Sequence, residues 1–216
     1  MSSTRVKICG LSTPDTVQAA VDAGADYLGF NFFPRSPRYV TPHLAAELAR
    51  LVPDTVLNVA LAVDADDAML DEIVKALKPD ILQFHGSETP GRLVELKARY
   101  GLTLMKAIPV SGPEDLEKSM LYRDSADLLL FDAKPPKSMA NALPGGNGLT
   151  FDWSLLAGQK PETPWMLSGG LDPDNVAEAI RVTGAEAVDV SSGVETAPGQ
   201  KNAGLIEKFI KAAKAV

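Results

Sequence analysis

Much of the chain repeats one unit, in which a short apolar segment leads to a helix start and then to a fixed kind of return. Five helix starts place a capping or turn residue directly before proline: Thr13-Pro14, Thr41-Pro42, Thr89-Pro90, Gly112-Pro113 and Asp172-Pro173. Proline suits the first helical position because its missing N–H would be unpaired there in any case. The returns are triplets that end in Asp or Glu, at 24–26, 78–80, 125–127 and 184–186. Such units constrain the chain to alternate helices with strands.

The apolar runs between these marks predict eight strands. They are Arg5–Cys9, Tyr27–Asn31, Leu57–Val63, Ile81–Phe84, Leu104–Ile108, Leu128–Phe131, Trp165–Leu167 and Ala187–Val190. Amphipathic stretches follow most of them, and the weakest helix is predicted over Asp152–Ala157. Near-continuous apolar strands that alternate with helices indicate a parallel sheet covered by helices.

Eight units predict an α/β fold, a closed (β/α)8 TIM barrel, with residues 1–216 forming a single catalytic domain. The length of 216 residues lies at the short end for this barrel and leaves little room for a second domain. The alternative is an open doubly wound sheet. That fold normally carries a glycine-rich fingerprint after its first strand, and the segment 9–12 (CGLS) does not supply one.

Charge and composition exclude several classes of partner. The net charge of −7 argues against general binding to nucleic acid or to acidic membranes, and no run is apolar for long enough to cross a bilayer. The start runs directly into a strand with no secretory signal, and a single cysteine cannot form an internal disulfide, so we expect a cytoplasmic protein. His43, His85 and the lone Cys9 are too few and too scattered for a structural zinc site, so no metal is expected.

The carboxyl ends of the strands are where such barrels carry their active sites. Cys9 ends the first strand, and Lys7 lies two residues earlier, so its side chain shares the same face. A nearby ammonium favours the thiolate, which is the basic form of cysteine. A lone cysteine is also commonly an inert small apolar residue in a core. Its position at a strand end favours the chemical interpretation.

A carboxylate follows the sixth strand at the same end of the predicted barrel. Asp132 comes directly after the apolar run 128–131, so it emerges beside the barrel mouth. Such a residue can simply cap a loop, or it can act as a general acid or base that faces Cys9. An acid and a base on opposite sides of a substrate suit an isomerisation by proton transfer.

Three glycine clusters predict a site for a phosphorylated small molecule. They are Ser168-Gly169-Gly170 after strand seven, Asp189 with Ser191-Ser192-Gly193 after strand eight, and Gly145-Gly146-Asn147-Gly148 in the strand-six loop. Loops seven and eight commonly bind phosphate in this fold, and glycine lets the backbone approach an anion closely. Glycines also serve ordinary tight turns, but three clusters together favour phosphate.

Other loop residues are candidates for binding and positioning. Arg38 can hold a planar carboxylate with two parallel hydrogen bonds, and Arg35 is an equal candidate from sequence alone. His85 is interpreted as a structural hydrogen-bonding residue near the mouth. The segment Asp132–Thr150 shows no clear secondary structure and is predicted to be a lid, with an insertion around Lys137–Pro144.

Taken together, these strings resemble the phosphoribosylanthranilate isomerase family. The matching segments are Val6–Gly10, Gly29–Phe33, Ser36–Arg38, Gln83–Gly86, Asp132, Gly145–Gly148, Phe151–Trp153, Leu167–Gly170, Pro173–Asn175, Asp189–Glu195 and Pro198–Lys201. They span the chain from the first strand to the last helix. Each string is modest by itself, but the set in this order is specific.

The resemblance implies a cofactor-free Amadori rearrangement of N-(5-phosphoribosyl)anthranilate to the 1-(2-carboxyphenylamino)-1-deoxyribulose phosphate in tryptophan biosynthesis. It implies that Asp132 is the general acid at the ribose ring oxygen and that Cys9 is the general base at C2. It also implies that Arg38 holds the anthranilate carboxylate, while the glycine clusters hold phosphate. Asn147 stands where many members have Ser or Thr. A monomer or a homodimer is compatible with the helix faces.

Two other hypotheses compete with this isomerase. One is a related phosphoribosyl barrel, of the histidine-pathway isomerase or indole-glycerol-phosphate synthase type. The histidine-pathway enzyme has an aspartate at the end of strand one, where this chain has Cys9. The other is a barrel that only binds a phosphorylated ligand, against which the joint presence of Cys9, Asp132 and Arg38 argues.

Overall fold

Eight parallel strands close into a barrel in the computed structural model, which describes residues 3–136, 143, 145–158 and 161–216. The strands are β1 (Arg5–Cys9), β2 (Tyr27–Asn31), β3 (Leu57–Ala62), β4 (Ile81–Phe84), β5 (Thr103–Val110), β6 (Leu128–Ala133), β7 (Trp165–Leu167) and β8 (Ala187–Val190). Each pairs with the next, and β8 pairs with β1 to close the ring. All eight predicted strands are present, and the (β/α)8 barrel is confirmed.

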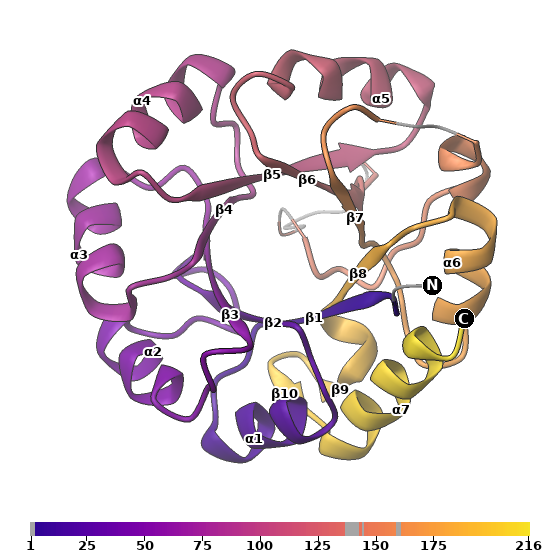
Figure 1. The fold of residues 1–216 in the computed structure, drawn as a ribbon, viewed down its shortest axis with the longest axis horizontal. Coiled ribbons are helices and arrows are strands. Elements are labelled where there is room, and N and C mark those ends of the chain that lie inside the picture. Colours follow the sequence, from indigo (N-terminus) through magenta and orange to yellow (C-terminus); the bar gives the residue numbers. More distant parts are fainter. Residues whose placement is uncertain (1–2, 137–142, 144, 159–160) are drawn as a thin grey trace.

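An outer ring of helices surrounds the strands (Figure 1). The α-helices are α1 (Pro14–Asp22), α2 (Pro42–Ala49), α3 (Asp67–Leu77), α4 (Pro90–Tyr100), α5 (Pro113–Ser119), α6 (Val176–Thr183) and α7 (Ala203–Lys214). The 3₁₀ segments are η1 (Met120–Tyr122), η2 (Trp153–Leu156) and η3 (Ser192–Val194). The weak helix predicted over Asp152–Ala157 is therefore only a 3₁₀ turn. No helix among the described residues is long and apolar enough to span a membrane.

The threonine–proline signals act as predicted at three helix starts. The side chains of Thr13, Thr41 and Thr89 accept hydrogen bonds from backbone N–H groups one turn into α1, α2 and α4, each with proline at the start of the helix. The prediction was wrong at Asp172-Pro173, because α6 begins only at Val176. Asp172 instead accepts from the backbone N–H groups of Asp174 and Asn175 and so forms a turn before the helix.

Two apolar layers hold the barrel together. The larger lies between strands and helices and includes Leu28, Phe30 and Phe209, all fully buried. The smaller fills the lower barrel interior, where Met105, Leu130 and their neighbours point inward. Side chains alternate along a strand, and on four strands the next inward position toward the carboxyl end is polar, at Gln83, Asp132, Ser168 and Asp189. These positions form the floor of the site.

One small element was not predicted. A two-stranded antiparallel hairpin, β9 (Glu195–Ala197) and β10 (Gln200–Lys201), follows η3 and precedes α7. Gly199 in its turn has φ +80°, and a Cβ there would lie 2.4 Å from the backbone oxygen of Pro37. Glycine is required at this position, because the hairpin packs directly on the loop after β2.

The structure describes only part of the predicted lid. Its insertion around Lys137–Pro144 lies, apart from Leu143, outside the described residues. Of the rest of this segment, Asp132, Ala133 and residues 145–149 line the cavity described below.

Candidate active site

One cavity opens at the carboxyl ends of the barrel strands and holds most of the predicted site residues. It has about 720 Å³ of space, including its open mouth. The predicted residues in its lining are Cys9, Arg38, Asp132, Gly146, Gly148, Ser168, Gly169, Gly170, Asp189, Ser191 and Ser192. Lys7 and Gly193 are not in the lining, and neither is Arg35, which is exposed. Of the two arginines that the sequence left open, Arg38 is the one at the cavity.

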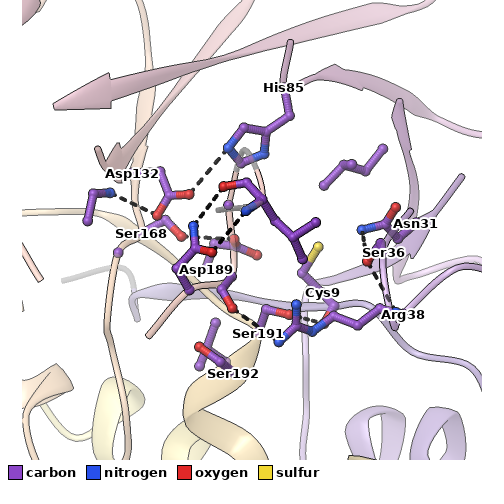
Figure 2. A pocket seen from close by; sticks show the side chains of 18 of the residues that line it. Cys9, Asn31, Ser36, Arg38, His85, Asp132, Ser168, Asp189, Ser191 and Ser192 are labelled. Atoms are coloured by element: carbon purple, nitrogen blue, oxygen red, sulfur yellow. Dashed lines mark hydrogen bonds and ion pairs between the residues drawn. The ribbon is translucent and has the colours of Figure 1, made fainter. Parts of the chain in front are cut away.

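Cys9 is held at the end of β1 with its thiol in the cavity wall (Figure 2). The residue is buried, and its carbonyl oxygen accepts a 3.1 Å hydrogen bond from Ser191 Oγ. Its register partner on β2 is Gly29, where a Cβ would lie 2.9 Å from Cys9 Sγ. A side chain at position 29 would crowd the sulfur, so this glycine creates the space in which the thiol lies.

Lys7 lies below Cys9, and its ammonium forms an ion pair with a carboxylate. Its Nζ is 2.8 Å from Asp189 Oδ1, and its side chain is completely buried. Asp189 Oδ2 also accepts from Ser168 Oγ at 3.1 Å. Burial alone would lower the pKa of Lys7, but Asp189 and then Cys9 outweigh burial, so the pKa is raised and the ammonium stays charged. Lys7 is therefore a buried charge beneath the cavity and outside its lining.

The sequence predicted that Lys7 would favour the thiolate of Cys9, and the structure shows the opposite net result. Burial raises the pKa of Cys9 above its ordinary value. Lys7 acts to lower it, Asp189 adds to the rise, and Lys201 acts to lower it again. The influence of Lys7 has the predicted sign, but burial exceeds it. The neutral thiol is therefore favoured at neutral pH.

Asp132 and His85 form a pair at the ends of β6 and β4, across the cavity from Cys9 and Arg38 (Figure 2). The separation between His85 Nε2 and Asp132 Oδ2 is 3.2 Å, and the other carboxylate oxygen accepts from the backbone N–H of Ala133 at 2.9 Å. A Cβ at Gly145 would lie within 2.7 Å of both the imidazole and the carboxylate. The glycine loop after β6 therefore lies directly against this pair.

The glycine loop after β6 contacts several parts of the cavity, and not only the predicted phosphate end. A Cβ at Gly146 would lie 2.5 Å from Arg38 Nη1, whereas one at Gly148 would lie 3.8 Å from Ser192 Oγ. Both residues have positive φ, +73° and +68°. Asn147 does not point to an anion, since its side-chain amide pairs with the backbone of Leu143. The loop runs from Asp132 past Arg38 to β8, and only its last glycine approaches the predicted phosphate end.

The loops after β7 and β8 form that end of the cavity. Gly169 and Gly170 have φ +88° and +64°, which favours glycine. A Cβ at Gly193 would lie 1.9 Å from the carbonyl oxygen of Leu171. Gly193 is thus needed for the close contact between the two loops, which explains why it lies behind the lining instead of in it.

Arg38 is oriented by a residue that the sequence analysis did not single out. Its Nε and Nη2 donate to the two carboxylate oxygens of Glu195 at 2.7 and 2.8 Å, and Nη2 also donates to the Gly146 carbonyl at 3.2 Å. Lys201 Nζ lies 2.6 Å from Glu195 Oε1. Burial alone would raise the pKa of Glu195, but Arg38 and Lys201 hold it below its usual range. One edge of the guanidinium is therefore already occupied.

Two further buried polar groups were missed. Lys106 on β5 donates to the carbonyl of Gly86 at 2.6 Å and to Glu88 Oε2 at 2.9 Å, and so braces the loop after β4. Gln83 lies in the cavity lining, and neither of its amide atoms has a hydrogen-bond partner among the described residues. Polar residues inside otherwise apolar strands were the only signal for either. Within the same ranges, no group of three or more His, Cys, Asp or Glu could hold a metal ion.

The fold and the cavity define this chain as an enzyme-type (β/α)8 barrel with a polar site at the carboxyl ends of its strands. A family model described as N-(5'phosphoribosyl)anthranilate (PRA) isomerase matches residues 6–212. The chain therefore belongs to the PRA isomerase family, and the resemblance seen in the sequence is confirmed.

Relatives and solved structures agree with this assignment. The N-(5'-phosphoribosyl)anthranilate isomerase of Parvibaculum lavamentivorans is 72% identical over 98% of this chain and 99% of that protein. The Brucella canis protein of the same name is 55% identical over 96% and 92%. The crystal structure of phosphoribosyl anthranilate isomerase from Thermotoga maritima superposes with a TM-score of 0.88 at 36% identity, over 99% of this chain and 100% of that one. A further isomerase structure, with a TM-score of 0.85 at 34% identity over 99% and 100%, is a complex with reduced 1-(o-carboxyphenylamino)-1-deoxyribulose 5-phosphate.

Proposed function

We propose that this chain isomerises N-(5-phosphoribosyl)anthranilate to the 1-(2-carboxyphenylamino)-1-deoxyribulose 5-phosphate with Cys9 as general base and Asp132 as general acid. Family membership makes the chain an isomerase of tryptophan biosynthesis. The proposal assigns the steps to residues. The observation that carries it is that a thiol from β1 and a carboxylate from β6 line one cavity with Arg38.

The reaction needs one proton delivered and one removed. Asp132 gives a proton to the ribose ring oxygen as the C1–O bond breaks and the ring opens to a Schiff base. The thiolate form of Cys9, which is the minor form at neutral pH, then takes the proton from C2. The electrons of that C–H bond form the enamine, which tautomerises to the aminoketose. Groups at two ends of the cavity can serve both steps while the substrate stays in place.

The remaining residues hold the two anionic ends of the substrate. Arg38 binds the anthranilate carboxylate with the part of its guanidinium that faces the cavity. The loops that contain Gly169, Gly170, Ser192 and Gly193 bind the phosphate. Lys7 contributes from below the cavity, through its charge. This assignment requires no cofactor, and a cytoplasmic location and a monomer or homodimer stay predictions from the sequence.

The experiment follows the loss of the substrate's anthranilate-type fluorescence with purified protein. Wild type should turn the substrate over, and Cys9→Ala and Asp132→Asn should each lower kcat by about 10²–10⁴-fold. Arg38→Met tests the site of the anthranilate carboxylate. Arg35→Met is its matched control, because Arg35 is exposed outside the cavity. Near-normal turnover by Cys9→Ala or Asp132→Asn would refute the assignment of that residue.

A further inference from the structure

The hairpin β9–β10 places two buried charges behind the cavity wall, and neither of them lines the cavity. The side chains of Glu195 and Lys201 are 3% and 1% exposed, and that of Arg38, which they contact, is 5% exposed. Burying three charged groups together is costly unless each one is paired and hydrogen-bonded. The details of the pairing show what the arrangement achieves.

Every oxygen of the Glu195 carboxylate is used. Oε1 accepts from Arg38 Nε at 2.7 Å and from Lys201 Nζ at 2.6 Å. Oε2 accepts from Arg38 Nη2 at 2.8 Å and from the backbone N–H of Gly199 at 3.2 Å. A carboxylate that accepts four hydrogen bonds, two of them from one arginine, can adopt only one orientation. The two bonds from Arg38 therefore fix the plane of its guanidinium.

Lys201 is saturated in the same way. Its ammonium donates to Glu195, to the carbonyl of Ser191 at 2.9 Å and to Ser191 Oγ at 3.2 Å. Ser191 Oγ in turn donates to the carbonyl of Cys9. The hairpin is therefore tied to the ends of β1 and β8 as well as to the loop after β2.

The charges also match the ligand that the proposed function requires. Arg38, Lys201 and Glu195 together carry one net positive charge, and the substrate carboxylate carries one negative charge. Because Glu195 occupies the Nε–Nη2 edge of Arg38, Nη1 is the guanidinium nitrogen that has no hydrogen-bond partner among the described residues, and Arg38 lines the cavity. Without Glu195, the guanidinium could rotate about its side-chain bonds, and two buried cations would be left without their anion.

We propose that Glu195 is a positioning residue, which acts through Arg38 to aim Nη1 at the substrate carboxylate, with Lys201 holding Glu195 in place. The inference rests on the proposed function, because it assumes that the carboxylate end of the substrate lies at Arg38. Glu195 itself touches neither the substrate nor the reacting atoms.

The test measures equilibrium binding of two fragments of the substrate to the full-length protein. Anthranilate reports the Arg38 end through its own fluorescence, and inorganic phosphate reports the other end by calorimetry. Glu195→Gln should weaken anthranilate on the order of tenfold, a change equivalent to one charge-assisted hydrogen bond. Phosphate should bind within about twofold of wild type. Glu47→Gln, an exposed residue on α2, is the control with the same chemical change.

A double-mutant cycle separates positioning from a general structural effect. Adding Glu195→Gln to Arg38→Met should cost no further anthranilate affinity, because the residue through which Glu195 acts is gone. An equal loss in both backgrounds, an equal weakening of both fragments, or unchanged anthranilate binding in Glu195→Gln would overturn the inference.

A second variant guards against loss of folding. Glu195→Gln with Lys201→Met removes one buried anion and one buried cation, so the net charge beside Arg38 stays at one. This variant should retain folded circular dichroism and still bind anthranilate more weakly than wild type, and wild-type affinity for anthranilate in it would refute the role of Glu195. Turnover of the complete substrate by wild type tests the proposed function separately, and it does not depend on these binding results.

Discussion

The buried pair between Lys7 and Asp189 offers the clearest test of how the barrel interior tolerates charge. Asp189→Asn keeps the shape of the side chain and removes its charge. The ammonium of Lys7 is completely buried and 2.8 Å from the carboxylate, so it would lose its only anionic partner within hydrogen-bonding distance among the described residues. Removing one member of a buried pair typically costs about 3–5 kcal/mol. For a chain of this length the expected fall in Tm is about 6–20 °C.

The measurement is thermal unfolding followed by circular dichroism at pH 7 and again near pH 10. Asp189 raises the pKa of Lys7 against the effect of burial, so the variant should lose the proton of Lys7 more readily than wild type. Loss of that proton removes the unpaired charge. The deficit of the variant should therefore shrink as the pH rises.

Two controls decide whether the reasoning holds. Asp124→Asn breaks an exposed pair with Arg123, whose side chains are 90% and 56% exposed, and should cost at most about 1 kcal/mol. Lys7→Met combined with Asp189→Leu removes both charges and should recover most of the lost stability. A loss in Asp189→Asn no larger than that in Asp124→Asn would refute the argument.

Three further outcomes follow from the site. Burial raises the pKa of Cys9, so the rate of its alkylation by iodoacetamide should keep rising with pH beyond the ordinary thiol pKa of roughly 8.5. A rate that reaches a plateau below pH 8 would contradict this. For the same reason kcat/KM should have an ascending limb at alkaline pH that disappears in Cys9→Ser, as a pH series of initial rates would show. Gly193→Ala should lower the free energy of unfolding by about 1–3 kcal/mol and raise KM, because its methyl group would meet the carbonyl of Leu171. Gly91→Ala, on the open surface of α4, is the control. It should be neutral or stabilising in the same unfolding and kinetic measurements.

The fold could be predicted almost completely because it depends on local signals. Apolar runs bounded by caps and returns fixed the eight strands, and their ends differ from the observed ones by at most a few residues. The start of α6 was wrong because Asp172-Pro173 has the sequence of a helix start but forms a turn with Asn175. The hairpin β9–β10 was missed because its strands, of three and two residues, are mostly polar and form no apolar run.

The positions of the site residues could be predicted from topology, but their partners could not. Strand ends meet at one rim of a barrel, so Cys9 and Asp132 were found by their places in the chain. Arg38 was preferred to Arg35 only through the family resemblance. Gln83 and Lys106 were missed as site groups because one polar residue inside an apolar strand does not reveal by itself which way its side chain points. Their inward or loop-facing contacts become visible only when the strands are packed.

The ion pairs show the physical reason for this limit. Lys7 and Asp189 are 182 positions apart, and Arg38 and Glu195 are 157 apart, yet closure of β1 against β8 makes the first pair register neighbours. A nearby ammonium predicts a thiolate at Cys9 only when that ammonium lacks a closer anion. Barrel closure supplies the anion, and the same burial that makes the pair necessary raises the pKa of the thiol. The basicity of Cys9 is therefore set first by burial and then by the charges of Lys7, Asp189 and Lys201, and a single neighbour in the sequence could not reveal it.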